Sequence, residues 1–394
     1  MLRTGSICTS FLYNYLSKDF KDSNGQQLDK NCQKLRCMSN TLQEYGGVLS
    51  KVSQILSLND QNNSSFDDCK PFSKEKTTLF FKQFIESQDI SCDNFEVYRS
   101  GSVGQVYKAI HDNKDVICKV QYAGLYEQTR SDLEMLDKVA TFLYCFADVK
   151  TAMLDVKQKM YEELDYIKEA ENHKLMYDLY KNTDIKIPKL IPSLCTDKVL
   201  VMHYMKGQSL QDFIANSDQT QRNILGNHLV KFVFENIYKH GILYSDVHYG
   251  NFLVRKDCKL GVLDFGCLHY LDKQLLSNLR KLHKSIRDNN QPDFYDIVTD
   301  MGIIKPDITE ESKTYIYDYF RMQYTPWISP EFEFTDEWLE LSTNKDGKLM
   351  KEWVLQPDMV YFNKIPYGSY HIFTKLKLKG NFRQMFDDMF VDID

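Results

Sequence analysis

Apolar and polar positions in the first ninety residues follow a helical period that polar stretches interrupt. In 42–58, apolar residues recur on one face at α-helical spacing, and 76–87 shows the same pattern over a shorter length. The stretches 21–35 and 59–75 are rich in Asn, Asp, Gln, Ser and Lys, which is typical of loops. This part of the chain therefore predicts helices joined by polar linkers.

The period changes at Phe95. Short apolar segments around turns follow, which is the pattern of β-strands, and longer segments with a 3.6-residue period come after them. The expected elements are, in order, two strands within 95–106, a strand at 115–120, helices at 125–146 and 153–180, and a strand at 198–204.

The rest of the chain is mainly helical in pattern. A helix expected at 221–240 is followed by Gly241, a common residue just past a helix C-terminus. Two short strands at 252–255 and 261–263 enclose a turn, and the chain after Asp272 is mostly helical. A small β-rich unit followed by a mainly helical one predicts an α+β fold with two lobes.

Composition narrows the class of protein. Hydrophobic residues make up 43% of the chain and charged residues 26%, which excludes a wholly disordered, collagen-like or coiled-coil protein. With only 17 glycines and 9 prolines in 394 residues, long helices are favoured over many-turned β folds. The net charge of −6 gives no general attraction to nucleic acid or anionic lipid. The longest apolar run, 139–147, is shorter than the roughly 20 residues that span a membrane.

Cysteine usage bears on the compartment. The ten cysteines include no Cys-x-x-Cys pair, so we expect reduced thiols and no structural zinc. This fits the cytoplasm or the matrix side of an organelle. Residues 1–18 contain Arg3 and Lys18 but no acid, which weakly resembles a targeting segment, and a frayed N-terminus explains the same residues.

A glycine-containing turn between the first two expected strands is a candidate phosphate-binding loop. Residues 99–106 read Arg-Ser-Gly-Ser-Val-Gly-Gln-Val and hold the second and third glycines of a Gly-x-Gly-x-x-Gly-x-Val loop. Glycines let backbone amides approach phosphate oxygens closely, although the turn alone also fits an ordinary β-turn. The residues that would bind a nucleotide are Ser100, Gly101, Ser102, Val103, Gly104 and Val106.

A lysine and a glutamate follow this loop. Lys119 ends the segment Val-Ile-Cys-Lys, which resembles the kinase strand whose lysine pairs with nucleotide phosphates. Glu169 lies on the next long helix and is a candidate partner for Lys119. Taken separately, a solvated strand-end lysine and a surface glutamate explain both residues.

The downstream spacing is more specific. Asp246 and Asn251 form an Asp-x-x-x-x-Asn pattern, and Asp264-Phe265-Gly266 begins thirteen residues after Asn251. A kinase catalytic loop has this order: a catalytic aspartate, an asparagine and then an aspartate that bind the metal. Asp246 would orient or deprotonate an acceptor hydroxyl, and Asn251 and Asp264 would bind Mg²⁺ that accompanies ATP.

Several segments resemble signatures of the UbiB/AarF/ADCK family of atypical kinase-like proteins. Residues 46–54 look like its Lys-x-Gly-Gln signature, and 163–172 are similar to its Glu-Leu-Asp-aromatic-x-x-Glu-Ala-x-Asn helix. Asp-Val-His-Tyr-Gly-Asn at 246–251 resembles its Asp-Pro-His-Pro-Gly-Asn catalytic loop, and 356–368 resemble its C-terminal region. The resemblance covers about residues 40–370.

The resemblance implies a kinase-like fold whose N-terminal helical extension packs over the active site. Lys51 and Gln54 would point from the extension toward the nucleotide, and Glu163 and Asp165 would contact the extension. The implied cofactors are ATP and Mg²⁺, and the implied context is ubiquinone or other isoprenoid-lipid metabolism, with lipid-synthesis enzymes as partners. The expected domains are an N-terminal segment at 1–40, the extension at 41–92, an N-lobe at 93–205 and a C-lobe at 206–394.

The chain departs from the family pattern at several positions. Ser53 replaces the glycine before Gln54. Where the family has an alanine-rich nucleotide loop, residues 99–102 read Arg-Ser-Gly-Ser, and Gly101 makes the loop more like that of ordinary kinases. We expect Gly101 to ease productive positioning of the γ-phosphate; the alternative is that Arg99 contacts a phosphate directly. In and around the catalytic loop the replacements are Tyr244, Ser245, Val247 and Tyr249, and the acidic and metal-binding residues remain.

Three functions stay open from sequence. The first is an ATP- and Mg²⁺-dependent kinase or ATPase. The second is a nucleotide-gated scaffold that binds lipid or a partner without phosphoryl transfer. The third is a small-molecule kinase of the choline or aminoglycoside type. Kinases of that type lack an extension like the one that carries Lys51 and Gln54 here, so this function ranks last. Peripheral membrane contact would need an amphipathic face such as the basic segment 275–287, which also fits an ordinary C-lobe helix.

Overall fold

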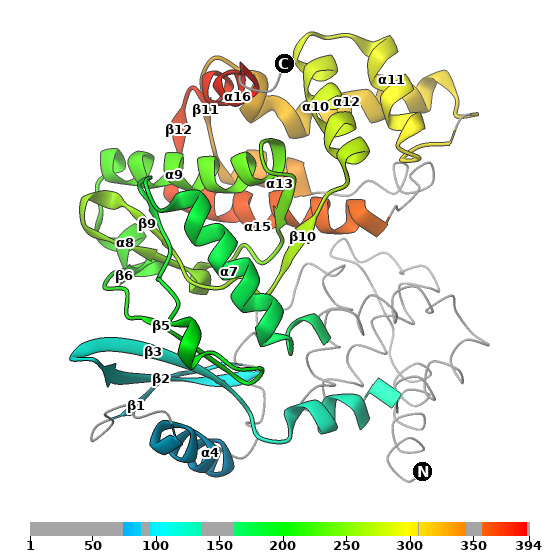
Figure 1. The fold of residues 1–394 in the computed structure, drawn as a ribbon. Helices are drawn as coiled ribbons and strands as arrows, with labels where there is room; N and C mark the ends of the chain where they lie inside the picture. Colours follow the sequence, from blue (N-terminus) through cyan, green and yellow to red (C-terminus); the bar gives the residue numbers. More distant parts are fainter. Residues whose placement is uncertain are drawn as a thin grey trace, which may run out of the picture. The chain divides into compact units, whose positions relative to one another are not determined.

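The computed structural model describes residues 74–87, 95–101, 103–131, 133–134, 161–305, 307–343 and 357–391 (Figure 1). The chain divides into two compact units, one made of Met1–Ala170 with Leu190–Tyr204 and the other of Glu171–Lys189 with Met205–Asp394. Segment 171–189, which the sequence assigns to the N-lobe, groups with the second unit. The expected segment 1–40, most of the extension at 41–92, and the helix at 42–58 lie outside the described residues.

The first unit is built on an antiparallel sheet with the strand order β1-β2-β3-β5. The β2–β3 hairpin turns at Asp112 and Asn113, which both have positive φ, the conformation that a two-residue hairpin turn requires. A register shift between Val97 and Arg99 interrupts the β1–β2 pairing. The strands are β1 (Glu96–Ser100), β2 (Gly104–His111), β3 (Lys114–Gln121) and β5 (Val199–His203), with the short η1 turn at Pro192–Leu194.

The two faces of this sheet carry different residues because side chains alternate along a strand. On one face, α4 (Lys74–Ser87) packs its Phe81 ring on Tyr107, with centroids 4.2 Å apart. Cys118 lies in the same buried cluster. On the other face, Ile117 packs with Tyr166 at the start of α7 (Tyr166–Tyr180). Lys119, two residues after Ile117, therefore belongs to the face opposite α4.

The expected continuous helix at 153–180 is wrong at residues 163–165. The chain turns there, and a new helix, α7, begins at Tyr166. Asp165 caps it, because its Oδ1 accepts a hydrogen bond from the N–H of Lys168 at 2.9 Å. Residues 153–160 lie outside the described part of the chain.

The second unit is mainly helical, as the pattern predicts. α9 begins at an Asp218–Gln221 capping box, and Gly241 follows it with a φ of +63°. The helices are α8 (Leu210–Asn216), α9 (Gln219–Tyr238), α10 (Lys273–Arg287), α11 (Gln291–Asp300), α12 (Glu310–Ile328), α13 (Asp336–Thr343), α15 (Pro357–Leu376) and α16 (Phe382–Val391).

Among the described residues, the second unit also contains three small sheets, which place its loops. Their orders are β4-β9-β8-β6, β10-β7 and β11-β12. The strands are β4 (Ile185–Lys186), β6 (Gln208–Ser209), β7 (Ile242–Tyr244), β8 (Phe252–Val254), β9 (Leu260–Val262), β10 (Leu268–Tyr270), β11 (Phe332–Glu333) and β12 (Lys379–Gly380), with η2 (Tyr249–Asn251) and η3 (Lys256–Cys258) as short helical turns.

The apolar side of α10 is buried in the core of the second unit. Leu279, Leu282 and Ile286 are fully buried in the helical core. Arg280 donates two hydrogen bonds to the Tyr238 carbonyl, and Arg287 pairs with Asp387 at 2.7 Å. The structure therefore supports the ordinary C-lobe helix for this segment. No helix among the described residues is long and apolar enough to cross a membrane.

Candidate functional site

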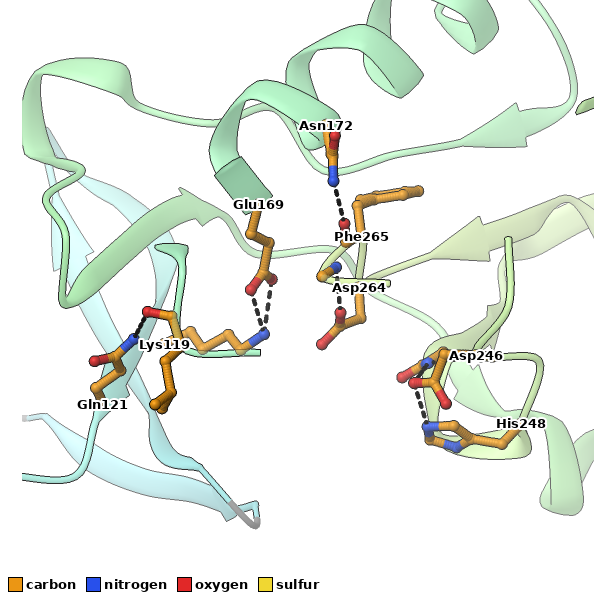
Figure 2. Close-up of polar contacts among 11 residues, drawn as sticks. Lys119, Gln121, Glu169, Asn172, Asp246, His248, Asp264 and Phe265 are labelled. Atoms are coloured by element: carbon orange, nitrogen blue, oxygen red, sulfur yellow. Dashed lines mark hydrogen bonds and ion pairs between the residues drawn. The ribbon is translucent and has the colours of Figure 1, made fainter. Parts of the chain in front are cut away.

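In the first unit, the structure brings Lys119 and Glu169 together (Figure 2). Lys119 Nζ lies 2.7 Å from Glu169 Oε1 and 2.8 Å from Oε2, so the ammonium group contacts both carboxylate oxygens. Nζ also lies 5.1 Å from the centre of the Tyr166 ring, within cation–π range. The Glu169 side chain is only 3% exposed and that of Lys119 18%. This is a nearly buried ion pair that holds the lysine in one position.

Local contacts explain why the pair forms. β3 ends close to the turn before α7, since Gln121 Nε2 donates a hydrogen bond to the Leu164 carbonyl. The Asp165 cap starts α7 at that turn, and Glu169 lies in the first turn of the helix. The Gln121–Leu164 hydrogen bond and the Asp165 cap therefore place the start of α7 beside β3, and this brings the Glu169 carboxylate to Lys119.

The glycine loop is closed by its own backbone. Gly101 N donates to the Gly104 carbonyl at 2.8 Å, and Tyr122 Oη donates to the Gly101 carbonyl at 3.1 Å. A Cβ on Gly104 would collide with the Val120 carbonyl, whereas one on Gly101 would meet only the Gly104 carbonyl at 3.5 Å. Ser100 ends β1, Val106 pairs with Lys119 across β2 and β3, and Ser102 lies outside the described residues.

In the second unit, Asp246, His248 and Asn251 of the predicted catalytic loop contact one another. Asn251 Nδ2 donates to Asp246 Oδ2 at 2.7 Å, and His248 Nε2 lies 3.2 Å from the same oxygen (Figure 2). The Gly250 N–H donates to His248 Nδ1 at 3.0 Å. A neutral His248 ring therefore carries its proton on Nε2, which faces Asp246.

These contacts set the charge of Asp246. Desolvation alone would raise the pKa of Asp246, and the negative charge of Asp264 acts in the same direction. The hydrogen bond and charge of His248, with the hydrogen bond from Asn251, outweigh both and lower this pKa below its usual value. Asp246 is therefore a carboxylate at neutral pH.

Asn251 and Asp264 lie at the same end of one β-hairpin. Asn251 precedes β8 and Asp264 follows β9, and these strands pair antiparallel, with Phe252 opposite Val262. The Leu263 N–H also donates to the Asn251 carbonyl at 3.0 Å. Within the described residues, the side-chain hydrogen bonds of Asn251 use Nδ2, so its Oδ1 is left as an acceptor.

This donor set suits Mg²⁺ bound together with phosphate. In the part of the chain that the structure describes, no three His, Cys, Asp or Glu side chains form a group that could hold a metal ion. An amide oxygen and a carboxylate are hard oxygen ligands, and Mg²⁺ in phosphate-transfer sites uses one or two such groups with phosphate oxygens and water. Asn251 and Asp264 fit that requirement.

Sequence reasoning did not identify the contacts of Asn172, Tyr270 and His248 in and around the candidate site. Asn172 donates from Nδ2 to the Phe265 carbonyl at 3.0 Å, and Tyr270 Oη donates to Asn172 Oδ1 at 2.7 Å. His248 contacts Asp246 directly, which the catalytic-loop motif alone does not indicate. Lys51 and Gln54 lie outside the described residues, so their role stays a prediction.

Comparison with known proteins decides the family. Residues 66–297, more than half of the chain, match the family model described as the ABC1 atypical kinase-like domain. This chain belongs to the ABC1 family. The resemblance drawn from its motifs is thereby confirmed.

Curated relatives agree with this assignment. An uncharacterized protein in a hydrogenase 1 5′ region of Clostridium pasteurianum is 25% identical, covering 79% of this chain and 63% of the relative. The mitochondrial atypical kinase coq-8 of Caenorhabditis elegans is 24% identical over 67% of this chain and 38% of its own length. The chloroplastic protein ACTIVITY OF BC1 COMPLEX KINASE 8 of Arabidopsis thaliana is 28% identical, covering 57% of this chain and 31% of that protein.

The chain spans less than two thirds of the length of each of these curated relatives. The Rv3197–erythromycin complex from Mycobacterium tuberculosis has a similar fold, with a TM-score of 0.66, 20% sequence identity and coverage of 88% of this chain and 93% of that one. The predicted α+β kinase-like fold is confirmed.

Proposed function

We propose that this ABC1-family chain is an atypical kinase or ATPase that binds ATP with Mg²⁺. The observation that carries the proposal is the nearly buried ion pair in which Lys119 contacts both oxygens of Glu169. Kinases need such a pair to hold the lysine that binds the nucleotide phosphates. Burying two charges is costly, so a pair placed here calls for a functional reason.

The roles of the other groups follow from their chemistry. Asn251 Oδ1 and the Asp264 carboxylate would hold Mg²⁺, which would neutralise charge on the phosphate oxygens. Asp246 would accept a hydrogen bond from the acceptor hydroxyl or water. Its contacts with His248 and Asn251 both go to Oδ2, which leaves Oδ1 for the acceptor. As the acceptor oxygen bonds to the γ-phosphorus, the bond to ADP breaks and the acceptor proton passes to Asp246.

The glycine loop would complete the phosphate contacts. Ser100, Gly101, Val103 and Gly104, with Ser102 between them, would form the backbone that lines the phosphates. The Gly101 N–H donates to the Gly104 carbonyl, so Gly101 would shape the loop. Val106 would contact the base from β2. Lys51 and Gln54 would reach the nucleotide from the extension, as the family resemblance implies.

The segment after Asp264-Phe265-Gly266 favours an acceptor that is small or lipid-like. Only 267–272 separate Gly266 from α10, and three of these residues are paired with β7. Protein kinases use a longer loop at this point, which includes their regulatory phosphorylation site. We propose an acceptor from isoprenoid-lipid metabolism, ubiquinone metabolism included, or water.

Turnover measurements test the proposal. We expect the full chain to hydrolyse or transfer the γ-phosphoryl of ATP, with a rate that rises when vesicles containing isoprenoid lipid are added. Asp246→Asn should lower turnover at least a hundredfold, since it removes the proton acceptor. Asp257→Asn, at the far end of the same β-hairpin, is the matched control and should leave it unchanged. ATP binding without turnover would instead support the nucleotide-gated scaffold.

A further inference from the structure

A buried amide lies behind the metal-binding segment of the second unit. Asn172, on α7, is only 2% exposed. Its Nδ2 donates to the Phe265 carbonyl at 3.0 Å, as Figure 2 shows, and its Oδ1 accepts from Tyr270 Oη at 2.7 Å. Asn172 thus joins the residue after Asp264 to a tyrosine on β10.

The Phe265 carbonyl decides which way this amide points, and the Tyr270 hydroxyl stabilises that orientation. A backbone carbonyl can only accept hydrogen bonds, so the Phe265 carbonyl requires the amide nitrogen on its side. The Asn172 oxygen then faces Tyr270, and the hydroxyl proton satisfies it. Without the Tyr270 hydroxyl, the buried Asn172 Oδ1 would lose this hydrogen bond. Leaving a buried acceptor unpaired costs more free energy than leaving an exposed one unpaired.

The contact continues to Asp264 through one peptide group. The Phe265 carbonyl and the Gly266 N–H belong to the same planar unit, so fixing one fixes the direction of the other. The Gly266 N–H donates to Asp264 Oδ1 at 2.9 Å. The Phe265 ring, fully buried against His173, keeps the segment from rotating as a whole.

We propose that Asn172 and Tyr270 are positioning residues for the Asp264 carboxylate. Tyr270 holds the Asn172 amide in its orientation, the amide fixes the 265–266 peptide, and that peptide holds the carboxylate in the direction in which it would bind Mg²⁺. The inference rests on the proposed function for the role of the metal, but the hydrogen-bond chain itself does not depend on any ligand.

Tyr270→Phe tests this series of hydrogen bonds by removing only the hydroxyl. Tyr270 is half exposed, and its ring stays in place in the variant, so the fold should be preserved. Tyr317→Phe is the matched control, because Tyr317 Oη donates to Asn289 Oδ1 at 3.0 Å in a tyrosine–asparagine contact that involves no candidate site residue. Asn172→Leu removes both hydrogen bonds and should act in the same direction more strongly.

Two readouts separate the positioning role from a merely structural one. In the first, without ligand, hydrogen exchange of the backbone at 264–267 should be roughly two- to tenfold faster in Tyr270→Phe, the size expected for one hydrogen bond, and unchanged in Tyr317→Phe. In the second, the Mg²⁺ concentration that gives half-maximal ATP binding should rise by a similar factor, while ATP binding in EDTA stays the same.

The outcomes are distinguishable. Wild-type exchange rates and wild-type Mg²⁺ dependence in Tyr270→Phe would overturn the positioning role even if the protein binds Mg²⁺ and ATP. If the wild-type chain binds no ATP, the proposed function fails, and the exchange measurement alone still decides whether Tyr270 orders residues 264–267. Faster exchange in both tyrosine variants would also contradict the inference.

Discussion

At the scale of single residues, most polar groups of the candidate site have at least one partner that is buried or belongs to the backbone. Glu169 and Asn251 are both buried, and Asp264 is held by the Gly266 N–H. Their directions are therefore set by the folded protein before any ligand arrives, which is the preorganisation that phosphoryl transfer requires. Changing one partner should alter both stability and ligand binding.

Replacing the lysine is the most direct residue-scale test of this coupling. Lys119→Met leaves the buried Glu169 carboxylate without its ammonium partner, so the free energy of unfolding should fall by about 3 kcal/mol, and ATP binding should be lost. Urea unfolding and calorimetry measure the two effects. Lys119→Met with Glu169→Met should recover most of the stability but not the binding. A single variant as stable as the wild type would contradict this account of the pair.

The two glycines of the loop should behave differently. Gly104→Ala forces a Cβ against the Val120 carbonyl and should cost about 1–3 kcal/mol of stability. Gly101→Ala meets only an ordinary contact and should melt at the wild-type temperature. If Gly101 eases positioning of the γ-phosphate, Gly101→Ala should nevertheless reduce phosphoryl transfer. Unchanged transfer in that variant would reject this role for Gly101.

Single residues also show where sequence reasoning stops. The spacing of Lys119, Asp246, Asn251 and Asp264 could be interpreted because family motifs keep a fixed order along the chain. The Asn172 contact with Tyr270 joins residues 98 positions apart, and no local period or motif indicates it. Side-chain pairs of this kind depend on how distant elements pack, so the structure is needed to see them.

At the scale of elements, the hydrophobic period predicted the sheet of the first unit and the β8–β9 hairpin, but not the short strands β4, β6, β7, β10, β11 and β12. The expected strand at 115–120 and the helix at 221–240 correspond to β3 and α9 within a few residues. The expected helix at 153–180 was wrong at 163–165, because Asp165 caps a new helix there and a cap competes with helix continuation. Period alone does not show where a polar side chain bonds to the backbone.

The packing of α10 predicts a pH dependence of stability. His283 stacks on Phe386 and Phe390 of α16 and contacts the rings of Tyr238 and Tyr324. Burial, with the charge of Arg287, lowers the pKa of His283 to about 3 against the effect of Asp288. The folded protein therefore keeps His283 neutral in mildly acidic solution, whereas the unfolded chain protonates it below its ordinary pKa of 6.5.

The sign follows from proton linkage. The stability that comes from keeping His283 neutral is fully present above pH 6.5 and is lost as the pH falls from 6.5 toward 3. Over this range the free energy of unfolding decreases by about 1.4 kcal/mol per pH unit. Urea unfolding at pH 7.5 and 5.5 should show a larger loss for the wild type than for His283→Phe, which has no such proton. Equal losses in the two proteins would show that His283 is not buried as a neutral group.

At the scale of the whole molecule, each of the two compact units carries part of the chemistry that family membership implies. The first contains the glycine loop and the Lys119–Glu169 pair, and the second contains Asp246, Asn251 and Asp264. α7 carries residues of both units, with Glu169 in one and Asn172 in the other. The roles of these residues stay predictions from the order of motifs along the chain.

The central claim is that the chain binds ATP through a metal held by Asp264. Calorimetric titration of the full chain with ATP, in Mg²⁺ and in EDTA, tests it most directly. The account predicts that Mg²⁺ tightens binding at least tenfold in the wild type and in Asp257→Asn, and that Asp264→Asn removes this gain. ATP binding that is equally tight with and without Mg²⁺, or a gain from Mg²⁺ that survives in Asp264→Asn, would contradict it.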